Sequence, residues 1–403
     1  MVFVFASILA QRKLTDYSYP KVSSMSFFQH LPFELTEDIL NHLDTDTLPK
    51  TLRTASFLRY PSEKRLYRII DLSSQTNEGL ANRQARFFRT VLENNRLAHH
   101  VVKLVMGGCS STLGDERVNR LIGGAMKKMI NLKDLTISGY PYITQAQLDS
   151  VPFSLTRLSI YEQELSDKAT KLPLLSIFRA HPNLEDHDMD VTELPHDLVE
   201  ALKAEQNDPS YATRILCPRV KRFMGYDEGL RLFLPSRIIE IARTGGAASE
   251  HIEDDDLEGV WLTPVLTQSY QKLRILEVWP DHYENTCFLP TIAPYLTSLT
   301  HLRIVDEISA IHADDYLLLS LGQIPALESV TLSSLLINWV TTVAMALNKV
   351  QLVCAVCPDI TEVYIGGVKY LDTEMYYRYT KGQGLHGSLV REEVAYRPYL
   401  EPA

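Results

Sequence analysis

The chain has 403 residues, of which 45% are hydrophobic and 22% charged, and its formal net charge is −10 at pH 7. This length allows a large core in two or three structural units, and the acidic balance argues against nucleic acid or an anionic membrane as partners of the whole chain. The five cysteines, an odd number, favour free thiols in a reducing compartment, so we expect a protein of the cytoplasm, the nucleus or both.

Residues 1–25 are expected to be a disordered leader. Their apolar run from Val2 to Ala10 is far shorter than the ~20 residues that span a bilayer. In a secretory signal, basic residues precede the apolar run, whereas here Arg12 and Lys13 follow it. An alternative hypothesis is that Met25 is the natural start, which the intact mass of the native protein would decide.

The segment 26–72 opens with the pattern of an amphipathic helix. Leu35, Ile39 and Leu43 recur at i, i+4 and i+8, which places them in a stripe on one face of a helix. Pro32 fits the first helical turn, where its missing N–H has no hydrogen bond to lose. We therefore predict a first short helix that starts near Pro32.

Two further helices and a strand are predicted in the same segment. The second helix carries Leu48 and Leu52 on its apolar side, and the third helix opens at Pro61. The apolar run at residues 69–72 then predicts a short closing strand. So short a segment cannot bury this much leucine alone, and we expect its excess apolar surface to contact a partner.

Several spaced positions in this segment carry a family resemblance. They are the runs Leu31-Pro32-x-Glu34-Leu35, Ile39-Leu40-x-x-Leu43, Thr47-Leu48, Ser56-x-Leu58-Arg59 and Leu66-Tyr67-Arg68-x-Ile70-Asp71-Leu72. With them, residues 26–72 resemble an F-box, although the tryptophan often found near the end of the second helix is absent. The resemblance implies a three-helix module that docks onto the Skp-type adaptor of a cullin-RING ubiquitin ligase. The alternative is an ordinary amphipathic helical hairpin that caps the domain that follows.

The resemblance also implies which side chains contact the adaptor, and through it the cullin. They are Leu31, Pro32, Leu35, Ile39, Leu40, Leu43, Leu48 and Leu52. Interfaces of this kind depend on a few apolar anchors. Some of these residues must instead pack inside the module itself, and the sequence does not separate the two groups.

The chain from residue 80 to residue 370 contains a degraded repeat. An aliphatic residue is followed by apolar positions three and five residues later, and this pattern predicts a strand with one buried face. The copies begin at Val101, Leu132, Leu155, Leu184, Val220, Leu273, Leu299, Leu327 and Ile360. Most gaps are near the period of a leucine-rich repeat, and the long gap after Val220 holds either two units or one unit with an insertion.

The segments between the copies have helical periodicity, which completes a strand–helix unit. Such units stack into a solenoid with the strands on the concave side. We therefore predict an α/β fold in which a three-helix F-box precedes a solenoid that resembles irregular leucine-rich repeats. A generic α/β domain is the alternative. The predicted buried ladder of the solenoid is Leu135, Leu158, Leu276, Leu302, Val330 and Val363.

The positions between the ladder residues are predicted to face solvent and to bind a target protein. They are Thr136, Ser159, Glu277, Arg303 and Thr331, whose mixed polarity favours a protein or peptide over a lipid. The acidic loop 245–258 is expected to be solvated and to attract a basic target, with a metal or basic-substrate site as the alternative. Residues 371–403 are rich in tyrosine and are predicted to form a C-terminal cap or tail, with a peptide-binding patch as the alternative.

Two short motifs do not meet the requirements of the sites that they resemble. The run Gly382-Gln383-Gly384-Leu385-His386-Gly387 matches a dinucleotide-binding loop, but too few residues follow it for a strand–helix–strand unit, so we expect a flexible glycine turn. Cys354 and Cys357 form a C-x-x-C without a second pair nearby, which argues against zinc. Cys357 precedes Pro358 as Cys217 precedes Pro218, so we expect Cys217 and Cys357 to be small buried thiols. We predict no catalytic residue, no metal and no cofactor.

The sequence favours a non-catalytic binding protein. From the F-box resemblance, we predict the substrate-recognition subunit of a Skp–cullin–F-box type ubiquitin ligase, which binds the adaptor through the F-box and a target protein through the repeats. Such a subunit supplies proximity between the target and the enzyme that carries ubiquitin. The alternative is a leucine-rich-repeat interaction scaffold without a ligase role, and adaptor binding distinguishes the two.

Overall fold

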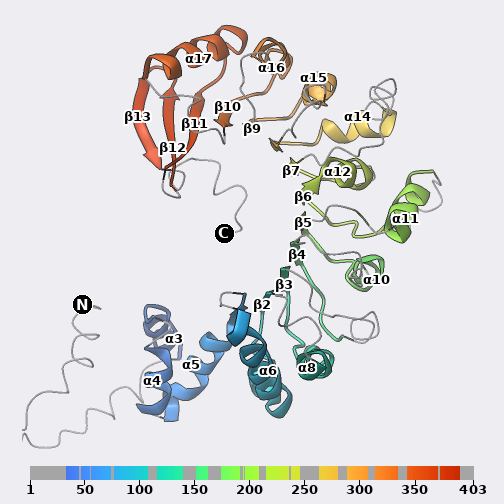
Figure 1. Ribbon diagram of the computed structural model, residues 1–403, viewed down its shortest axis with the longest axis vertical. Coiled ribbons are helices and arrows are strands. Elements are labelled where there is room, and N and C mark those ends of the chain that lie inside the picture. Colours follow the sequence, from blue (N-terminus) through green and yellow to red (C-terminus); the bar gives the residue numbers. More distant parts are fainter. Residues whose placement is uncertain are drawn as a thin grey trace, which may run out of the picture. The chain divides into compact units, whose positions relative to one another are not determined.

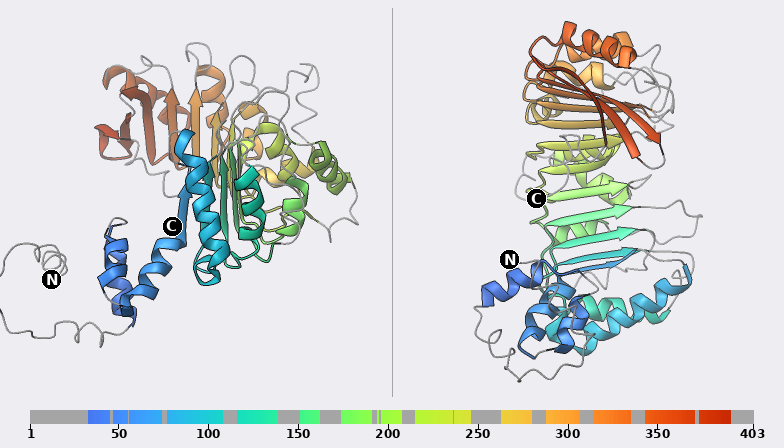
Figure 2. Two further views of the ribbon diagram at one scale, coloured as in Figure 1. Left: turned by 60° about the horizontal axis from the view of Figure 1, so that its bottom comes forward. Right: turned by 90° about the vertical axis from the view of Figure 1, so that its left-hand side faces the viewer.

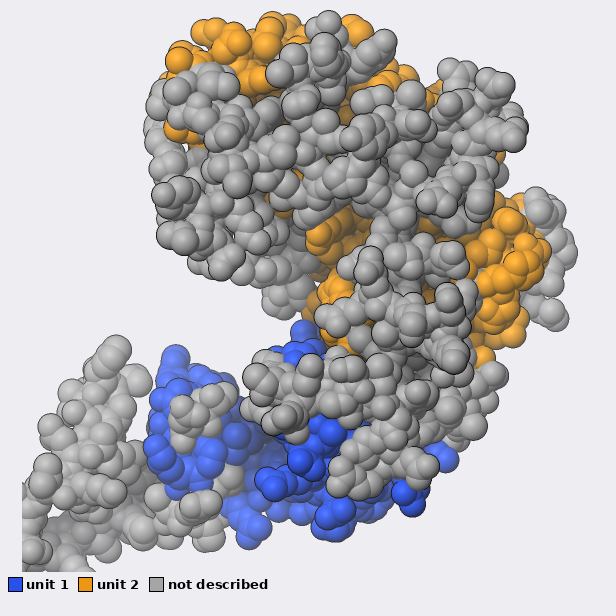
Figure 3. All heavy atoms as spheres, in the orientation of Figure 1, with its two compact units in different colours: residues 1–134, 150–153 blue, residues 135–149, 154–403 orange. Residues whose placement is uncertain are grey.

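The chain folds into two compact units, which Figure 3 colours separately. The computed structural model describes residues 33–44, 47–54, 56–73, 77–107, 116–138, 151–161, 174–190, 194, 196–207, 215–235, 237–245, 263–279, 288–306, 314–334, 343–370 and 373–390. Unit 1 comprises residues 1–134 and 150–153, and unit 2 comprises residues 135–149 and 154–403. The leader 1–25, Leu31, Pro32 and the acidic loop after Gly245 lie outside the described residues.

Unit 1 consists of helices and one parallel pair of strands (Figure 1). Its elements are α3 (Phe33–Asn41), α4 (Leu48–Thr54), α5 (Ser56–Arg68), β1 (Ile69–Leu72), α6 (Asn77–Glu93), α7 (Asn95–Ala98), β2 (Lys103–Gly107) and α8 (Glu116–Met126). β1 and β2 pair with Ile69 opposite Lys103 and Leu72 opposite Met106. Helices and the closing strand thus cover the segment in which the sequence predicts them.

The ends of α3 and α4 are held by side-chain hydrogen bonds. At the start of α4, the Asp44 carboxylate accepts a hydrogen bond of 2.6 Å from the backbone N–H of Thr47. At the end of α3, the guanidinium of Arg65 donates to the carbonyl oxygens of Leu40 and Leu43. The last carbonyls of a helix have no partner within the helix, so Arg65 both satisfies them and joins α3 to α5.

The third helix begins at Ser56, whereas the sequence places its start at Pro61. Proline is unfavourable inside a helix because it lacks an N–H and its ring crowds the preceding turn. Pro61 nevertheless lies inside α5 and is buried, as are Ser62 and Glu63 after it. The packing of this turn therefore outweighs the local preference of proline.

Unit 2 alternates strands with helices along its whole length. Its elements are β3 (Asp134–Ser138, in unit 2 from Leu135), β4 (Arg157–Tyr161), α10 (Leu174–Ala180), β5 (Asp186–Asp190), α11 (His196–Asn207), β6 (Arg222–Tyr226), α12 (Asp227–Phe233), β7 (Ile241–Gly245), α14 (Pro264–Tyr270), β8 (Ile275–Trp279), α15 (Phe288–Ile292), the 3-10 helix η5 (Ala293–Tyr295), β9 (His301–Asp306), α16 (Asp314–Leu321), β10 (Ser329–Ser334), α17 (Val343–Val356), β11 (Glu362–Tyr370), β12 (Thr373–Thr380) and β13 (Gly384–Val390). Figures 1 and 2 show its helices on one side of its strands.

The strands of unit 2 are hydrogen-bonded in the order in which the chain makes them. They are parallel from β4 to β11, while β12 and β13 add to the end of the sheet in antiparallel fashion. Parallel neighbours joined by helices are typical of repeated strand–helix units. The predicted α/β class is thus confirmed, and the assignment to leucine-rich repeats remains a prediction.

One row of side chains runs through the sheet as a continuous buried ladder. In register from β4 to β11 its members are Leu158, His187, Phe223, Ala242, Leu276, Leu302, Val330 and Val363. Every member is buried, and so is Leu135 on β3. The predicted ladder residues therefore occupy the face of the strands that packs against the helices.

The long gap after Val220 holds two units, because β7 lies within it. The second unit carries Ile239, Ala242 and Thr244 at the spacing of the other copies. All three side chains are buried. Alanine and threonine stand where most other copies carry larger apolar residues, so the pattern is hard to see in the sequence.

The two most degraded copies pack around a buried histidine. The ring of His187 lies 4.8 Å from that of Phe178, 5.0 Å from Phe233 and 5.7 Å from Phe223, measured between ring centroids. Neither ring nitrogen has a hydrogen-bond partner among the described residues. Burial, together with the nearby charge of Arg237, lowers the pKa of His187 to about 3, so the folded core holds a neutral imidazole.

A buried ion pair supports the chain beside this cluster. The guanidinium of Arg237 lies 2.8 Å from the carboxylate of Glu205, and both are buried. The same two side chains bond the backbone of Leu216, whose N–H donates to Glu205 at 2.5 Å and whose carbonyl accepts from Arg237. The pair thus holds the turn at Cys217, which has a φ of 47° that non-glycine residues rarely adopt.

The C-terminal part of unit 2 is a hairpin on the last parallel strand. β12 pairs with β11, and β13 pairs with β12. The connection between β12 and β13 contains Gly382 and Gly384 with φ of 82° and 86°, a region that glycine enters at little cost. The G-x-G-x-x-G run therefore makes a turn between antiparallel strands, in a context unlike that of a dinucleotide-binding loop.

No helix of the described residues is long and apolar enough to cross a membrane.

Replacing Leu276 with alanine should test the ladder. Its side chain lies between Ala242 and Leu302 with no exposed surface, so the change should lower the free energy of unfolding by about 2–5 kcal/mol. Leu319→Ala on α16 is the control, because Leu319 is 64% exposed and its loss should cost less than about 0.5 kcal/mol. Urea unfolding followed by circular dichroism measures both, and equal losses would contradict the ladder.

Replacing His187 with leucine should make the protein less sensitive to acid. The pKa of His187 is about 3 when folded and about 6.5 when unfolded, so only the unfolded chain gains this proton as the pH falls below about 6.5. Between about pH 7.5 and pH 5, the wild type should therefore lose about 2 kcal/mol more stability than His187→Leu. Urea unfolding at both pH values is the measurement. The control is His42→Leu, at an exposed position, which should lose as much stability between the two pH values as the wild type. Equal losses in all three proteins would contradict a contribution from the burial of His187.

Candidate functional site

The adaptor-binding residues predicted on α3 and α4 divide into two groups. Leu35 and Ile39 are 51% and 43% exposed, one helical turn apart on α3. Leu40 and Leu48 are buried and form the packing of the helices themselves. Leu43 is half-buried, the side chain of Leu52 is not among those described, and Leu31 and Pro32 lie outside the described residues. The exposed apolar side chains of the predicted set are thus Leu35 and Ile39 among the residues described.

Three of the predicted target-binding residues are buried, so the expectation that they face solvent is wrong. Glu277 is 1% exposed, Arg303 3% and Thr331 2%. They are direct cross-strand neighbours, with Arg303 opposite both Glu277 and Thr331. Adjacent side chains in such a row contact one another, so a polar position between ladder residues is not thereby exposed. Thr136 and Ser159 are half-buried.

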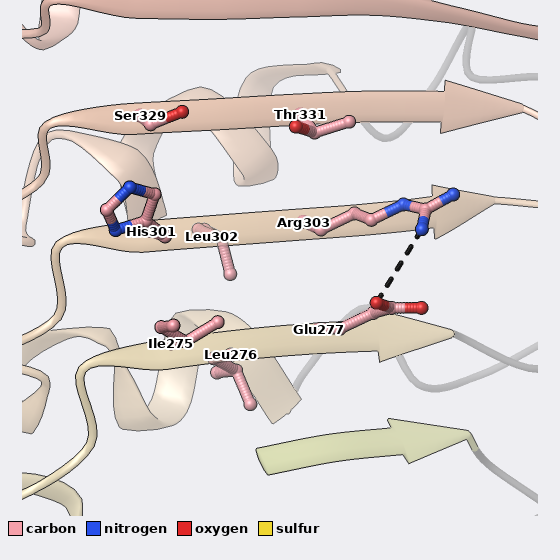
Figure 4. Close-up of a pocket in the computed structure, with 8 residues that line it drawn as sticks. All are labelled: Ile275, Leu276, Glu277, His301, Leu302, Arg303, Ser329 and Thr331. Carbon is pink, nitrogen blue, oxygen red and sulfur yellow. Dashed lines mark ion pairs between the residues drawn. The ribbon is translucent and has the colours of Figure 1, made fainter. Parts of the chain in front are cut away.

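The buried polar row on β7, β8 and β9 is built around one carboxylate. Oxygens of Glu277 lie 3.3 Å from Nε of Arg243 and 3.6 Å from Nη1 of Arg303 (Figure 4 shows the second pair). A carboxylate buried this deeply is stable only with such partners. Arg243 is the accessible end of the row, because its side chain is 35% exposed while that of Arg303 is 4% exposed.

A small hollow lies beside this row. It is lined by residues of β8, β9 and β10, and Figure 4 shows His301, Ser329 and Thr331 among them. Its free space is enough for about one water molecule. Burial lowers the pKa of His301 below its ordinary value, although the carboxylates of Glu328 and Glu362 act in the opposite direction. A hollow of this size is not a site for a small-molecule ligand.

A second polar row on β4, β5 and β6 is more accessible. Asp186 lies between two cross-strand arginines, with Nε of Arg157 at 3.2 Å and Nη1 of Arg222 at 3.6 Å from its carboxylate. All three side chains keep part of their surface in solvent, and Arg157 keeps the most, at 30%. These arginines therefore sit in fixed positions and still present part of each guanidinium outward.

A tyrosine and an aspartate adjoin this row. The hydroxyl of Tyr161 on β4 donates a hydrogen bond of 2.5 Å to the carboxylate of Asp188 on β5. Burial, followed by the charge of Asp188, raises the pKa of Tyr161 well above its ordinary value. The phenol is thus a neutral donor, and its ring offers apolar surface beside the charged row.

Sequence reasoning missed these residues, although a signal for them exists. Strand β5 reads Asp186, His187, Asp188, Met189, Asp190, so acidic and buried positions alternate as on the other strands. The repeat pattern located this strand through Leu184, but it scored the buried positions and not the acids between them. Asp186, Asp188 and Arg222 lie on the two copies that look most degraded in the sequence, whereas Arg157 and Tyr161 lie on the intact copy that begins at Leu155.

The described cysteines are not part of a metal site. Among the residues that the structure describes, no group of three or more histidine, cysteine or acidic residues is placed to hold a metal ion. Cys217 and Cys357 are buried, as predicted, and burial raises their pKa values to about 12 and about 11. Because the thiolate is the reactive form, these two thiols are poor nucleophiles.

In comparisons with known proteins, no family model and no curated protein matches the chain. The F-box and leucine-rich-repeat assignments therefore rest on the residues quoted for them.

Replacing Glu277 with alanine should destabilise the protein. The change removes the carboxylate that Arg243 and Arg303 share, and breaking a buried pair in this way costs about 3–5 kcal/mol. Asp186→Ala is the matched control, because Asp186 is also flanked by two arginines but is 22% exposed, and its loss should cost about 1 kcal/mol or less. Urea unfolding of both variants measures the loss in the free energy of unfolding. Equal losses would show that the contribution of these ion pairs to stability does not depend on their burial.

Proposed function

We propose that this chain is the substrate-recognition subunit of a Skp–cullin–F-box type ubiquitin ligase. The observation that carries the proposal is the exposure of Leu35 and Ile39 within the F-box-like segment, at two positions where the resemblance implies adaptor contact. The adaptor binds α3 and its neighbours, and a target protein binds unit 2. The chain supplies no catalytic group in this role.

The exposed side chains on α3 have the geometry of a docking site. Leu35 and Ile39 are four residues apart, so they project from the same face of the helix. An amphipathic helix that binds a partner's groove does so through anchors at this spacing. Leu40 and Leu48 pack inward, and they fix the helix that carries these anchors.

Contacts within unit 1 join the proposed docking helices to the first strands. Glu63 on α5 is buried and forms ion pairs with Arg59 and with Arg96 on α7. The carbonyl of Arg68, at the end of α5, accepts a hydrogen bond of 3.0 Å from Val102, just before β2. These contacts hold the proposed docking helices on the first strands of unit 1.

The accessible polar row supports a protein as the target. Arginine and tyrosine are enriched among the residues that dominate protein interfaces, and Arg157 in this row and the adjoining Tyr161 are both accessible. Charges of both signs alternate from one strand to the next, which fits a protein or peptide with its own pattern of charge better than a lipid. This proposal moves the target site away from Glu277, Arg303 and Thr331.

The second candidate is an interaction scaffold without a ligase role. Its specific support is the same contact between α5 and α7, which would also be expected of helices that only cap the first strands. Capping alone gives no reason for Leu35 and Ile39 to remain exposed, and for this reason we prefer the ligase proposal.

Adaptor binding should depend on the exposed pair on α3. The double variant Leu35→Ala with Ile39→Ala should lose at least about tenfold in affinity for a purified Skp-type adaptor, because a few apolar anchors dominate such interfaces. The control is Leu319→Ala with Leu347→Ala, which removes two exposed leucines from α16 and α17 and should leave adaptor affinity unchanged. Titration calorimetry measures both, and circular dichroism checks that each variant is folded.

A wild-type chain that binds no Skp-type adaptor at micromolar concentration would end the ligase proposal in favour of the scaffold. Co-purification with mass spectrometry then identifies targets. Capture of these targets should fall with Arg157→Glu while adaptor binding persists. Full capture by this variant would place the target site elsewhere.

A further inference from the structure

Positive charge is concentrated in one stretch of this acidic protein. Residues 56–133 contain fourteen Lys and Arg against six Asp and Glu, whereas the whole chain has 40 and 50. The stretch is therefore net positive by eight charges in a chain whose net charge is −10. Such asymmetry is typical of a surface that binds an anionic partner.

Part of this exposed charge lies on two adjacent helices of unit 1, and further exposed cations lie on α5, on α7 and at Lys133. Arg86 and Arg89 are exposed on α6, Arg120 is exposed on α8, and Lys127 is exposed just after α8. We refer to these four residues as the basic face. Figures 1 and 2 show α6 and α8 side by side.

The packing of α6 against α8 is close. A Cβ on Gly124 of α8 would come within 2.9 Å of the Leu92 side chain on α6, so glycine permits this approach. Nζ of Lys128 also donates a hydrogen bond of 2.6 Å to the carbonyl oxygen of Leu92. These contacts hold the two helices together, so the basic face is a fixed array of charges.

Two of the acidic side chains described in this stretch are engaged away from Arg86 and Arg89. Glu63 is buried against Arg96, and Asp71 accepts a hydrogen bond of 2.6 Å from the hydroxyl of Ser73. Glu93, at the end of α6, is an exposed acid on the helix that carries Arg86 and Arg89. Cationic groups thus outnumber anionic groups among the exposed side chains described on α6 and α8.

We propose that the basic face binds an acidic protein segment, rich in Asp and Glu. Three of its four residues are arginines, whose planar guanidinium forms paired hydrogen bonds with a carboxylate. The proposal is independent of the ligase role, because it requires neither the adaptor nor the target site on unit 2. Its partner is defined by carboxylates arranged along an extended segment or a surface.

Nucleic acid fits this surface less well. Binding to single strands uses exposed aromatic side chains for stacking, and the described side chains of α6 and α8 include no exposed aromatic. The net charge of −10 also opposes the approach of a long polyanion.

Fluorescence anisotropy with the full chain tests the proposal. The probe is a short fluorescein-labelled peptide of alternating Glu and Asp, and it should bind the wild type at about 50 mM salt and more weakly at about 200 mM. Arg86→Glu with Arg89→Glu should lower peptide affinity by about tenfold or more, because two attractions become repulsions. Both substitutions keep a good helix former in α6.

A matched charge reversal in unit 2 provides the control. Arg219→Glu with Lys221→Glu changes the net charge by the same amount at exposed positions, and it should reduce peptide affinity by less than about twofold. Equal losses in the two double variants would overturn the proposal, as would tighter binding of duplex DNA of the same formal charge. Adaptor binding is measured on the same proteins, so failure of this proposal and failure of the ligase proposal are separate results.

Discussion

The cross-strand register of unit 2 is the constraint on which its other features depend. A strand has a side-chain period of two, so the choice of Leu158, Leu276 and Val330 for the buried row also decides which residues form the opposite face. Because the strands from β4 to β11 pair in parallel, the same face is buried in each of them. A shift of one residue in any strand would bury its charged side chains among the leucines, and this cost keeps the rows in register.

The same register determines the electrostatics of the polar face. Asp186 and Glu277 each stand opposite an arginine on both neighbouring strands, so each carboxylate is stabilised from two sides. Pairing of this kind permits burial, which is why Glu277 and Arg303 leave solvent while the more exposed Asp186 and Arg157 remain partly hydrated. These positions all carry charged side chains, but only some of them reach solvent. Solvent exposure therefore decides which parts of the polar face are able to contact a partner.

The sequence pattern predicted where the strands lie better than it predicted which of their side chains are shielded from solvent. The three-and-five spacing located strands as degraded as β5, and it missed β7 because Ala242 and Thr244 do not look apolar enough. Period-two alternation correctly assigned residues such as Thr331 to the polar face, but exposure depends on neighbours that are distant in sequence. Likewise, the first helix was predicted from its leucine spacing, while only tertiary packing separates the exposed Leu35 from the buried Leu40.

The two units expose different kinds of side chain, and this difference affects how each unit would bind a partner. Unit 1 leaves apolar Leu35 and Ile39 and cationic Arg86 in solvent, whereas the polar rows of unit 2 pair their charges across strands. Covering exposed leucine is favourable by itself, since it removes apolar surface from water. A partner of the paired rows must instead replace existing contacts, so it gains mainly from matching their pattern. Burial of apolar surface would thus favour binding at unit 1, whereas binding at the paired rows of unit 2 would depend on complementary charge.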